Sequence, residues 1–142
     1  MALVLADVGA DVILKAFFNN SWAAGGKNLT LKLFTNNITP ADTDTASTYI
    51  EATGGGYAAI TLTNGSWTVT VGNDPSDAVY TTQTFSFTGT IGGSGIVYGY
   101  FIVDADGVLV HAEKFSSAFT PLSLPTETKV IPKFQMSKGT PT

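Results

Sequence analysis

The sequence predicts a mainly β protein: an antiparallel β-sandwich or jelly-roll-like domain with one short N-terminal helix. Threonine accounts for 21 of the 142 residues, and β-branched residues favour strands. Short runs that alternate apolar and polar residues recur along the chain, separated by turn-forming residues. Two apolar runs between Gly95 and Phe115 are joined by a glycine-containing turn, which is typical of a β-hairpin.

One helix is expected ahead of the strands, over residues 8–18. Asp7 is a suitable N-cap, and the polar residues 19–21 end the segment. The apolar side chains cover a broad arc that leaves only Asp11 and Lys15 on a narrow polar strip. Such a helix needs contacts on more than one side, either across the open face of its own sheet or against another subunit.

The first strand is expected at residues 28–35, where three leucines alternate with Thr30 and Lys32. Residues 36–48 are almost entirely polar and predict a surface loop. A second loop is predicted over residues 72–78. Further strands are predicted at residues 57–63, 67–71, 83–89 and 128–136, in addition to the hairpin of residues 95–115.

Two local signals refine these strands. Asn64-Gly65 predicts a tight hairpin turn between the strands 57–63 and 67–71. Pro132 cannot donate a hydrogen bond to a sheet, so the last strand is expected to lie at a sheet edge or to carry a bulge there.

The length predicts a single domain, with a helix and linker arm over 1–27, a sandwich over 28–136 and a tail over 137–142. A chain of this size buries about 68–70% of its unfolded surface, so it needs no metal or disulfide. Cysteine is absent, which excludes disulfides, thiolate zinc sites and thiol nucleophiles. No segment reaches the ~20 apolar residues of a membrane span.

The first strand of the predicted hairpin is apolar on both faces. Alternation places one triplet on one face and a second triplet on the other: Tyr98, Tyr100 and Ile102, against Val97, Phe101 and Val103. An antiparallel sandwich usually keeps one face of each strand in water. This strand therefore demands a further layer, from a helix or from another copy of the chain.

These patterns nominate an interface with a partner subunit. Its candidate residues lie on the predicted helix, in the linker and on the two-faced strand: Val12, Ile13, Phe17, Phe18, Trp22, Tyr98, Tyr100 and Ile102. Nucleic acid is not expected as a partner, because the net charge is −4 and the seven cationic residues are all lysine.

Candidate catalytic and metal-binding residues are few. His111 and Glu113 share one face of a strand, but no nucleophile elbow accompanies this one histidine, so we interpret them as a cross-strand polar pair. Asp42, Asp44 and the segment 104–107 resemble fragments of calcium loops without the distal glutamate. A turn is the favoured interpretation of 104–107, and no catalytic residue, metal or cofactor is predicted.

Aromatic residues leave one alternative open. Trp22, Trp67, Tyr57 and Tyr80 are of the kind that stacks on sugars, so a carbohydrate- or receptor-binding module is a second hypothesis. Such rings also form sandwich cores.

A third hypothesis, a hydrolase built on His111, would need an aspartate or serine beside that histidine in a cleft.

Three segments resemble small structural proteins of tailed-bacteriophage virions, most closely capsid decoration (cement) proteins: Asn28 to Thr35 (NLTLKLFT), Thr53 to Thr63 (TGGGYAAITLT) and Val97 to Phe115. The resemblance implies a sandwich or jelly-roll-like homotrimer, made in the host cytoplasm, on the outside of an icosahedral shell. Its partner would be the major capsid protein, whose neighbouring subunits it clamps. The resemblance implies no catalytic residues.

Overall fold

The computed structural model describes residues 13–15, 17–18, 28–70, 75–121 and 126–136. It is mainly β, with antiparallel sheets and helical residues near the N-terminus, which confirms the predicted fold class. The chain forms two compact units. The first comprises Met1–Lys27, Thr63–Gln83 and Val130–Thr142, and the second comprises Asn28–Leu62 and Thr84–Lys129.

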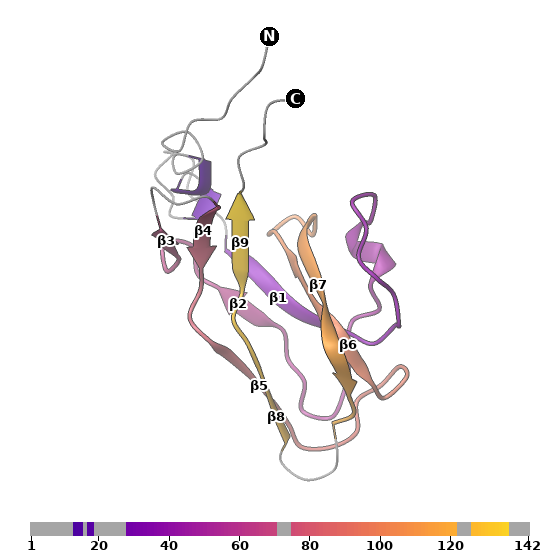
Figure 1. The fold of residues 1–142 in the computed structure, drawn as a ribbon. Helices are drawn as coiled ribbons and strands as arrows, with labels where there is room; N and C mark the ends of the chain where they lie inside the picture. The colour runs from indigo at the N-terminus through magenta and orange to yellow at the C-terminus, as the bar shows by residue number, and fades with distance from the viewer. Residues whose placement is uncertain (1–12, 16, 19–27, 71–74, 122–125, 137–142) are drawn as a thin grey trace. The chain divides into compact units, whose positions relative to one another are not determined.

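The strands are short, as the alternating runs predict (Figure 1). In the described residues they are β1 (Leu29–Phe34), β2 (Ile60–Leu62), β3 (Thr68–Thr70), β4 (Ser76–Val79), β5 (Gln83–Phe87), β6 (Val97–Val103), β7 (Leu109–Phe119), β8 (Thr126–Val130) and β9 (Lys133–Met136). A 3-10 helix, η1 (Ala46–Thr48), lies in the loop after β1. Residues 13–15 and 17–18 are helical, within the range predicted for the N-terminal helix.

The second unit is built on a four-stranded antiparallel sheet in the order β2-β1-β6-β7. The predicted hairpin of β6 and β7 is confirmed, and the aligned pair Leu31 and Ile102 fixes the register of β6 against β1. β5 and β8 form a separate pair. Because β1 and β6 are the central strands, their side chains form the core on both faces.

One face of this sheet is covered by the β5–β8 pair. Leu31, Leu33 and Ile102 are fully buried on this face. The ring of Phe85 on β5 stacks on Tyr57 at 5.8 Å, and Phe87 packs edge-on against Phe119 of β7 at 6.0 Å. This contact between layers is that of a sandwich.

The opposite face is covered by the loop that follows β1. Tyr49 stacks on Phe101 at 5.2 Å and packs on Phe34 at 5.1 Å, and Val103 completes this buried cluster. Figure 1 shows the loop and η1 lying beside the β6–β7 hairpin. The sequence correctly predicts that both faces of β6 are covered, but the extra layer is this loop of the same chain, not a helix or a second copy.

Gly99 allows β6 to fit between its two neighbours. A Cβ atom at this position would lie 2.6 Å from the Phe34 ring and would overlap the carbonyl oxygen of Glu113. Real Cβ atoms do not tolerate such contacts, and Phe34 is itself fully buried. The glycine therefore lets a large ring lie directly against the β6 backbone.

The first unit contains the three-stranded sheet β3-β4-β9 and an aromatic cluster. Phe18 packs against Trp67 and against Phe134, each at 4.6 Å, and Trp67 meets Tyr80 edge-on at 5.0 Å. Phe18, Trp67 and Tyr80 are buried. Phe18, in the helical residues near the N-terminus, is thus held by rings from β9 and from the segment beside β3.

The hairpin predicted at Asn64-Gly65 is wrong, although the turn itself is present. β2 pairs with β1, whereas β3 pairs with β4, so the two strands that flank the turn belong to different sheets. The turn instead binds the helix: the Gly65 N–H donates to the Phe18 carbonyl at 2.9 Å, and the Asn64 amide donates to the Phe17 carbonyl at 3.3 Å. Helix carbonyls at a C-terminus need such donors.

Two further predictions need correction near the end of the chain and in the second loop. Residues 76–78, predicted as loop, belong to β4, whose inward side chains are the small Ser76 and Ala78, 1% and 0% exposed. Residues 128–136, predicted as one strand, are divided at Pro132 into β8 and β9, which pair in different sheets. Pro132 accepts a hydrogen bond from the Tyr80 N–H at this break.

We expect Gly99→Ala to lower the free energy of unfolding by about 1–3 kcal/mol, the usual cost of overpacking. Urea denaturation of the purified protein measures this change. Gly89→Ala is the matched control, because a Cβ at Gly89 meets only the Gly55 Cα at 3.9 Å and Gly89 has no positive φ. Equal effects of the two substitutions would contradict the close packing described for Gly99.

Candidate functional site

The predicted interface residues that the structure describes differ in their exposure within each unit. Ile13 and Phe17 are 47% and 49% exposed, whereas Phe18 is buried in the aromatic cluster of the first unit. Tyr100 and Ile102 are 3% and 0% exposed within one chain. Val12 and Trp22 lie outside the described residues.

Tyr98 differs from the expected alternation. It is half-buried and packs against the Phe34 and Phe101 cluster, on the face opposite the one predicted for it. The β6–β7 register shifts between Val97 and Gly99, so Tyr98 lies opposite a bulge of β7, where the regular ladder is interrupted. Tyr98, Tyr100 and Ile102 therefore form no shared exposed face for a partner subunit.

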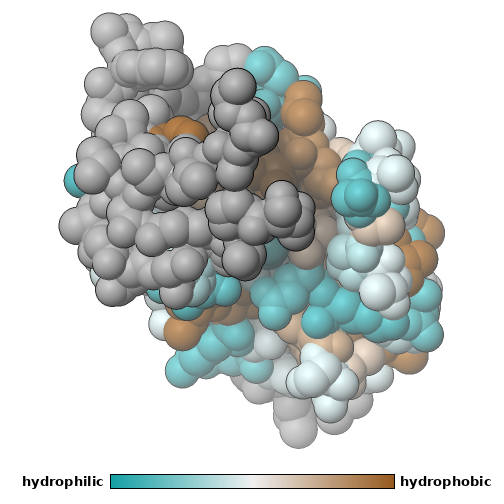
Figure 2. All heavy atoms as spheres, turned by 45° about the horizontal axis from the view of Figure 1, so that its top comes forward, coloured by the Kyte–Doolittle hydropathy of each residue, from teal (hydrophilic) through white to brown (hydrophobic). Residues whose placement is uncertain are grey.

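The tip of the β6–β7 hairpin is the most exposed apolar feature of the second unit. Val108 is 60% exposed there, more than any other large apolar side chain in the described residues. It lines a groove of about 480 Å³ between the hairpin turn and η1, together with Thr45, Ala46, Ser47, Gly107 and Leu109. We call this the hairpin-tip groove. Figure 2 shows hydrophobic patches of this kind set among polar surface.

Sequence reasoning missed this groove because its two walls lie far apart in the chain. Ala46 belongs to a segment read as a bare polar loop, and Val108 belongs to a turn. Val108, an apolar residue directly after the Asp-Ala-Asp-Gly turn, is the one feature of the sequence that could have indicated an exposed apolar site here. Packing of the loop onto the hairpin, which composition does not reveal, forms the groove.

Asp44 organises the loop wall of this groove. One of its carboxylate oxygens accepts from the Ala41 N–H at 2.9 Å and from the Tyr49 hydroxyl at 2.7 Å. The hydrogen bond from Ala41 and that from Tyr49 lower the pKa of Asp44. Asp42 and Asp44 also line a neighbouring pocket of about 310 Å³, which the same loop shares with His111.

His111 and Glu113 lie on one side of β7, as predicted, next to Tyr100 of β6. The Tyr100 hydroxyl donates to Glu113 at 2.6 Å, and its ring lies 5.9 Å from that of His111. Burial and this hydrogen bond raise the pKa of Tyr100. Burial lowers the pKa of His111, and the Glu113 charge opposes that effect. The described hydrogen bonds of Asp44 go to Ala41 and Tyr49, so they do not join Asp44 to His111.

The Asp104 segment is a turn, in agreement with its favoured interpretation. One carboxylate oxygen of Asp104 accepts from the N–H groups of Asp106 and Val108, each at 2.9 Å. Gly107 follows with φ +82°, a conformation suited to glycine. The Asp104 carboxylate thus serves the geometry of the hairpin turn.

The rings proposed for sugar stacking do not form one exposed face in the described residues. Trp67 and Tyr80 pack on each other and are buried in the first unit. Tyr57, in the second unit, is half-buried and donates from its hydroxyl to Glu51, which also binds Lys32 at 2.8 Å. Trp22 lies outside the described residues.

We predict that lowering the pH from 7.5 to 5.5 destabilises the protein through His111. Its pKa is lowered in the folded state, so the unfolded chain binds the proton more readily as the pH falls through about 6.5. The stabilisation present above that pH is then lost. Thermal denaturation across this range should show a smaller pH dependence in His111→Gln. An identical pH dependence in both proteins would contradict the burial of the imidazole.

No group of three or more metal-binding side chains occurs in the described parts of the chain. Within those same parts, no helix is long and apolar enough to cross a membrane. Comparisons of the sequence and the fold with protein-family models, with curated proteins and with solved structures found no match.

Proposed function

We propose that this protein is a non-enzymatic structural component of a tailed-bacteriophage virion, a decoration protein that binds the outer face of the capsid. In this role it works by burying surface across the joints between major capsid subunits. The virion assignment rests on the sequence resemblance in three segments, and these segments contribute β1, β2 and the β6–β7 hairpin of one sheet.

The observation that carries the proposal is the hairpin-tip groove. Val108 is 60% exposed beside Leu109 and Ala46, on a chain in which only 13% of residues are charged. Burying an exposed valine stabilises a contact by about 1.5 kcal/mol or more. A weakly charged surface with an apolar projection suits protein contact, and a net charge of −4 does not favour nucleic acid.

The homotrimer is part of the proposal and follows from the resemblance. β6 no longer requires a partner subunit, because the chain's own loop covers its second face. Three copies would still give a clear advantage, since three weak contacts acting together hold a lattice far better than one. Sedimentation equilibrium at micromolar concentration should give about three times the 14.8 kDa mass of one chain. A monomer would contradict this part of the proposal.

The binding test uses shells assembled from the major capsid protein of the phage that encodes this chain. We expect the protein to co-sediment with the shells and to raise their disruption temperature. Val108→Asp should weaken binding at least about tenfold per contact, because the lost apolar burial corresponds to that factor. Ala58→Asp, which adds the same charge at an exposed position outside the groove, is the matched control.

Two results would contradict the proposal at different levels. Absence of binding to both immature and expanded shells would remove the decoration role. Binding that Val108→Asp and Ala58→Asp reduce equally would keep the role but remove the hairpin-tip groove from the contact.

A further inference from the structure

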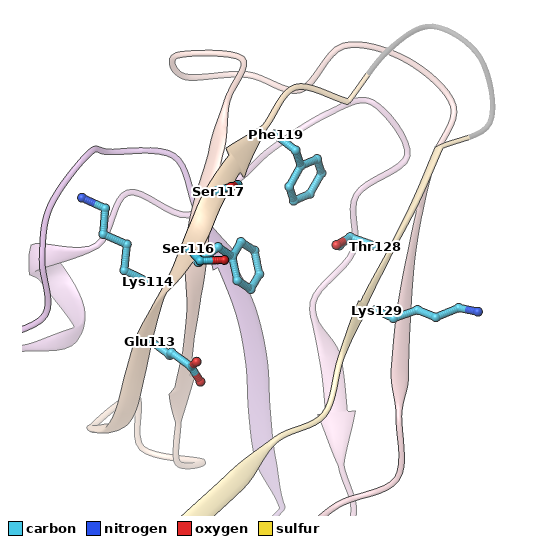
Figure 3. Close-up of a pocket in the computed structure, with 8 residues that line it drawn as sticks. Glu113, Lys114, Ser116, Ser117, Phe119, Thr128 and Lys129 are labelled. Atoms are coloured by element: carbon cyan, nitrogen blue, oxygen red, sulfur yellow. The ribbon is translucent and has the colours of Figure 1, made fainter.

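The second unit carries a groove at its open side, between β7 and β8 (Figure 3). Its volume is about 490 Å³. Figure 3 shows Ser116 and Phe119 pointing from β7 toward β8, with Thr128 pointing back from β8. Lys114 and Lys129 point away from the groove and lie at its rim. The two strands face one groove without pairing with each other.

The β7 side of this groove is a free sheet edge. Among the described strands β7 pairs with β6 alone, at the end of the order β2-β1-β6-β7. The register then leaves four residues of β7, 115–118, opposite the single residue Tyr98, because Lys114 aligns with Gly99 and Phe119 with Val97. Main-chain donors and acceptors on such an edge can pair with another extended chain.

This edge lacks the charge and the proline that often protect exposed strands. Natural edges are blunted by lysine, proline, inward-pointing charge or a bulge. The segment 115–119 reads Phe-Ser-Ser-Ala-Phe, with neither charge nor proline. Ser116, Ser117 and Ala118 are exposed. The four unpaired residues of β7 form a bulge on this edge, and bulges are over-represented at sheet edges and next to active sites.

Two aromatic side chains, Phe115 and Phe119, form the bottom of the groove and pack on rings of the core. The Phe115 and Phe119 rings are half-buried and lie 6.2 Å apart. Phe115 contacts Tyr100 at 6.1 Å and Phe119 contacts Phe87 at 6.0 Å, so the core holds both rings in place. Their remaining exposed surface faces the groove and would be covered by apolar side chains placed two residues apart on a strand.

Charge at the rim favours an acidic residue in the occupant. Lys129 is exposed on β8, and Lys114 lies on the β7 side, where its amine donates to Asn37 at 2.8 Å. The one carboxylate at the groove, Glu113, already accepts the Tyr100 hydroxyl. A carboxylate on the outward side of a bound strand would therefore lie on the side of Lys114, and the exposed Lys129 adds positive charge at the opposite rim.

We propose that the β7–β8 groove binds an extended peptide segment of another protein by strand addition. The peptide pairs with the free edge of β7 over residues 115–119, a span of about 16 Å. Alternate apolar side chains enter the groove above Phe115 and Phe119, and an acidic side chain on the opposite face lies on the side of Lys114. Main-chain pairing supplies affinity, and the groove supplies specificity. This site does not depend on the proposed virion role.

The probe is the capped heptapeptide Thr-Val-Asp-Val-Thr-Val-Thr, added to ¹⁵N-labelled protein up to 1 mM. We expect amide shifts and slower hydrogen exchange at residues 114–119, with no change at Ile60–Leu62, the other edge of the same sheet. Two methylated peptides provide the control. N-methylation of the three valines blocks one edge of the peptide, and N-methylation of the other residues blocks the opposite edge. One of these peptides should bind at least tenfold more weakly than the other.

Variants of the protein, tested for binding of the same peptide, provide a second way to locate the site. Ser117→Pro removes an edge N–H and should abolish binding, whereas Ser117→Ala should retain it. Lys129→Glu should weaken binding and reduce the salt dependence of binding. The fold should be unchanged, because Lys129 is exposed. The proposal is overturned by no shift at β7, by equal binding of both methylated peptides, or by equal shifts at β2. Concentration-dependent shifts at β7 without peptide would also overturn it, since the edge would then belong to a second copy.

Discussion

Burial of β6 on both faces is the constraint on which the second unit depends. A central strand with apolar side chains on two sides needs two covering layers, and an ordinary sandwich supplies one. Here the β5–β8 pair covers the side of Ile102, and the loop after β1 covers the side of Phe101. Gly99 and Phe34 show how tight the second layer is, because the ring lies where a Cβ would otherwise be. The same chain thus supplies both layers over β6, although the sequence pattern is equally consistent with a layer from another subunit.

The same loop connects packing to surface chemistry. The Asn36 side chain ties its two ends together, donating to the Thr48 carbonyl and accepting from the Ile50 N–H, each at 2.9 Å. Asp44 holds Tyr49 over Phe101. With the loop fixed in this way, η1 stands beside the hairpin turn and leaves Val108 at the rim of a groove. A layer that completes the core therefore also shapes the surface proposed to contact the capsid.

Alternation was sufficient to predict β1, β5 and the β6–β7 hairpin, since large apolar residues mark their inward positions. It failed at β4, where Ser76 and Ala78 occupy the buried positions and resemble a loop by composition. Asn64-Gly65 correctly predicts a turn but incorrectly predicts that the flanking strands pair. Its donors bind helix carbonyls, and the strands on either side pair in different sheets. The aromatic residues nominated for binding were mostly core residues. Val108 and the β7–β8 groove escaped prediction because each is formed by segments distant in the chain.

The loop after β1 is a structural layer over β6, and substitutions of Tyr49 test this role. Tyr49→Ala and Tyr49→Phe are compared by urea denaturation of the purified protein. Removing the ring should lower the free energy of unfolding by about 3–5 kcal/mol, the usual cost of truncating a buried aromatic residue. Removing only the hydroxyl, which bonds to Asp44, should cost about 1 kcal/mol. Near-native stability of Tyr49→Ala would show that β6 is stable without this layer and would contradict the account.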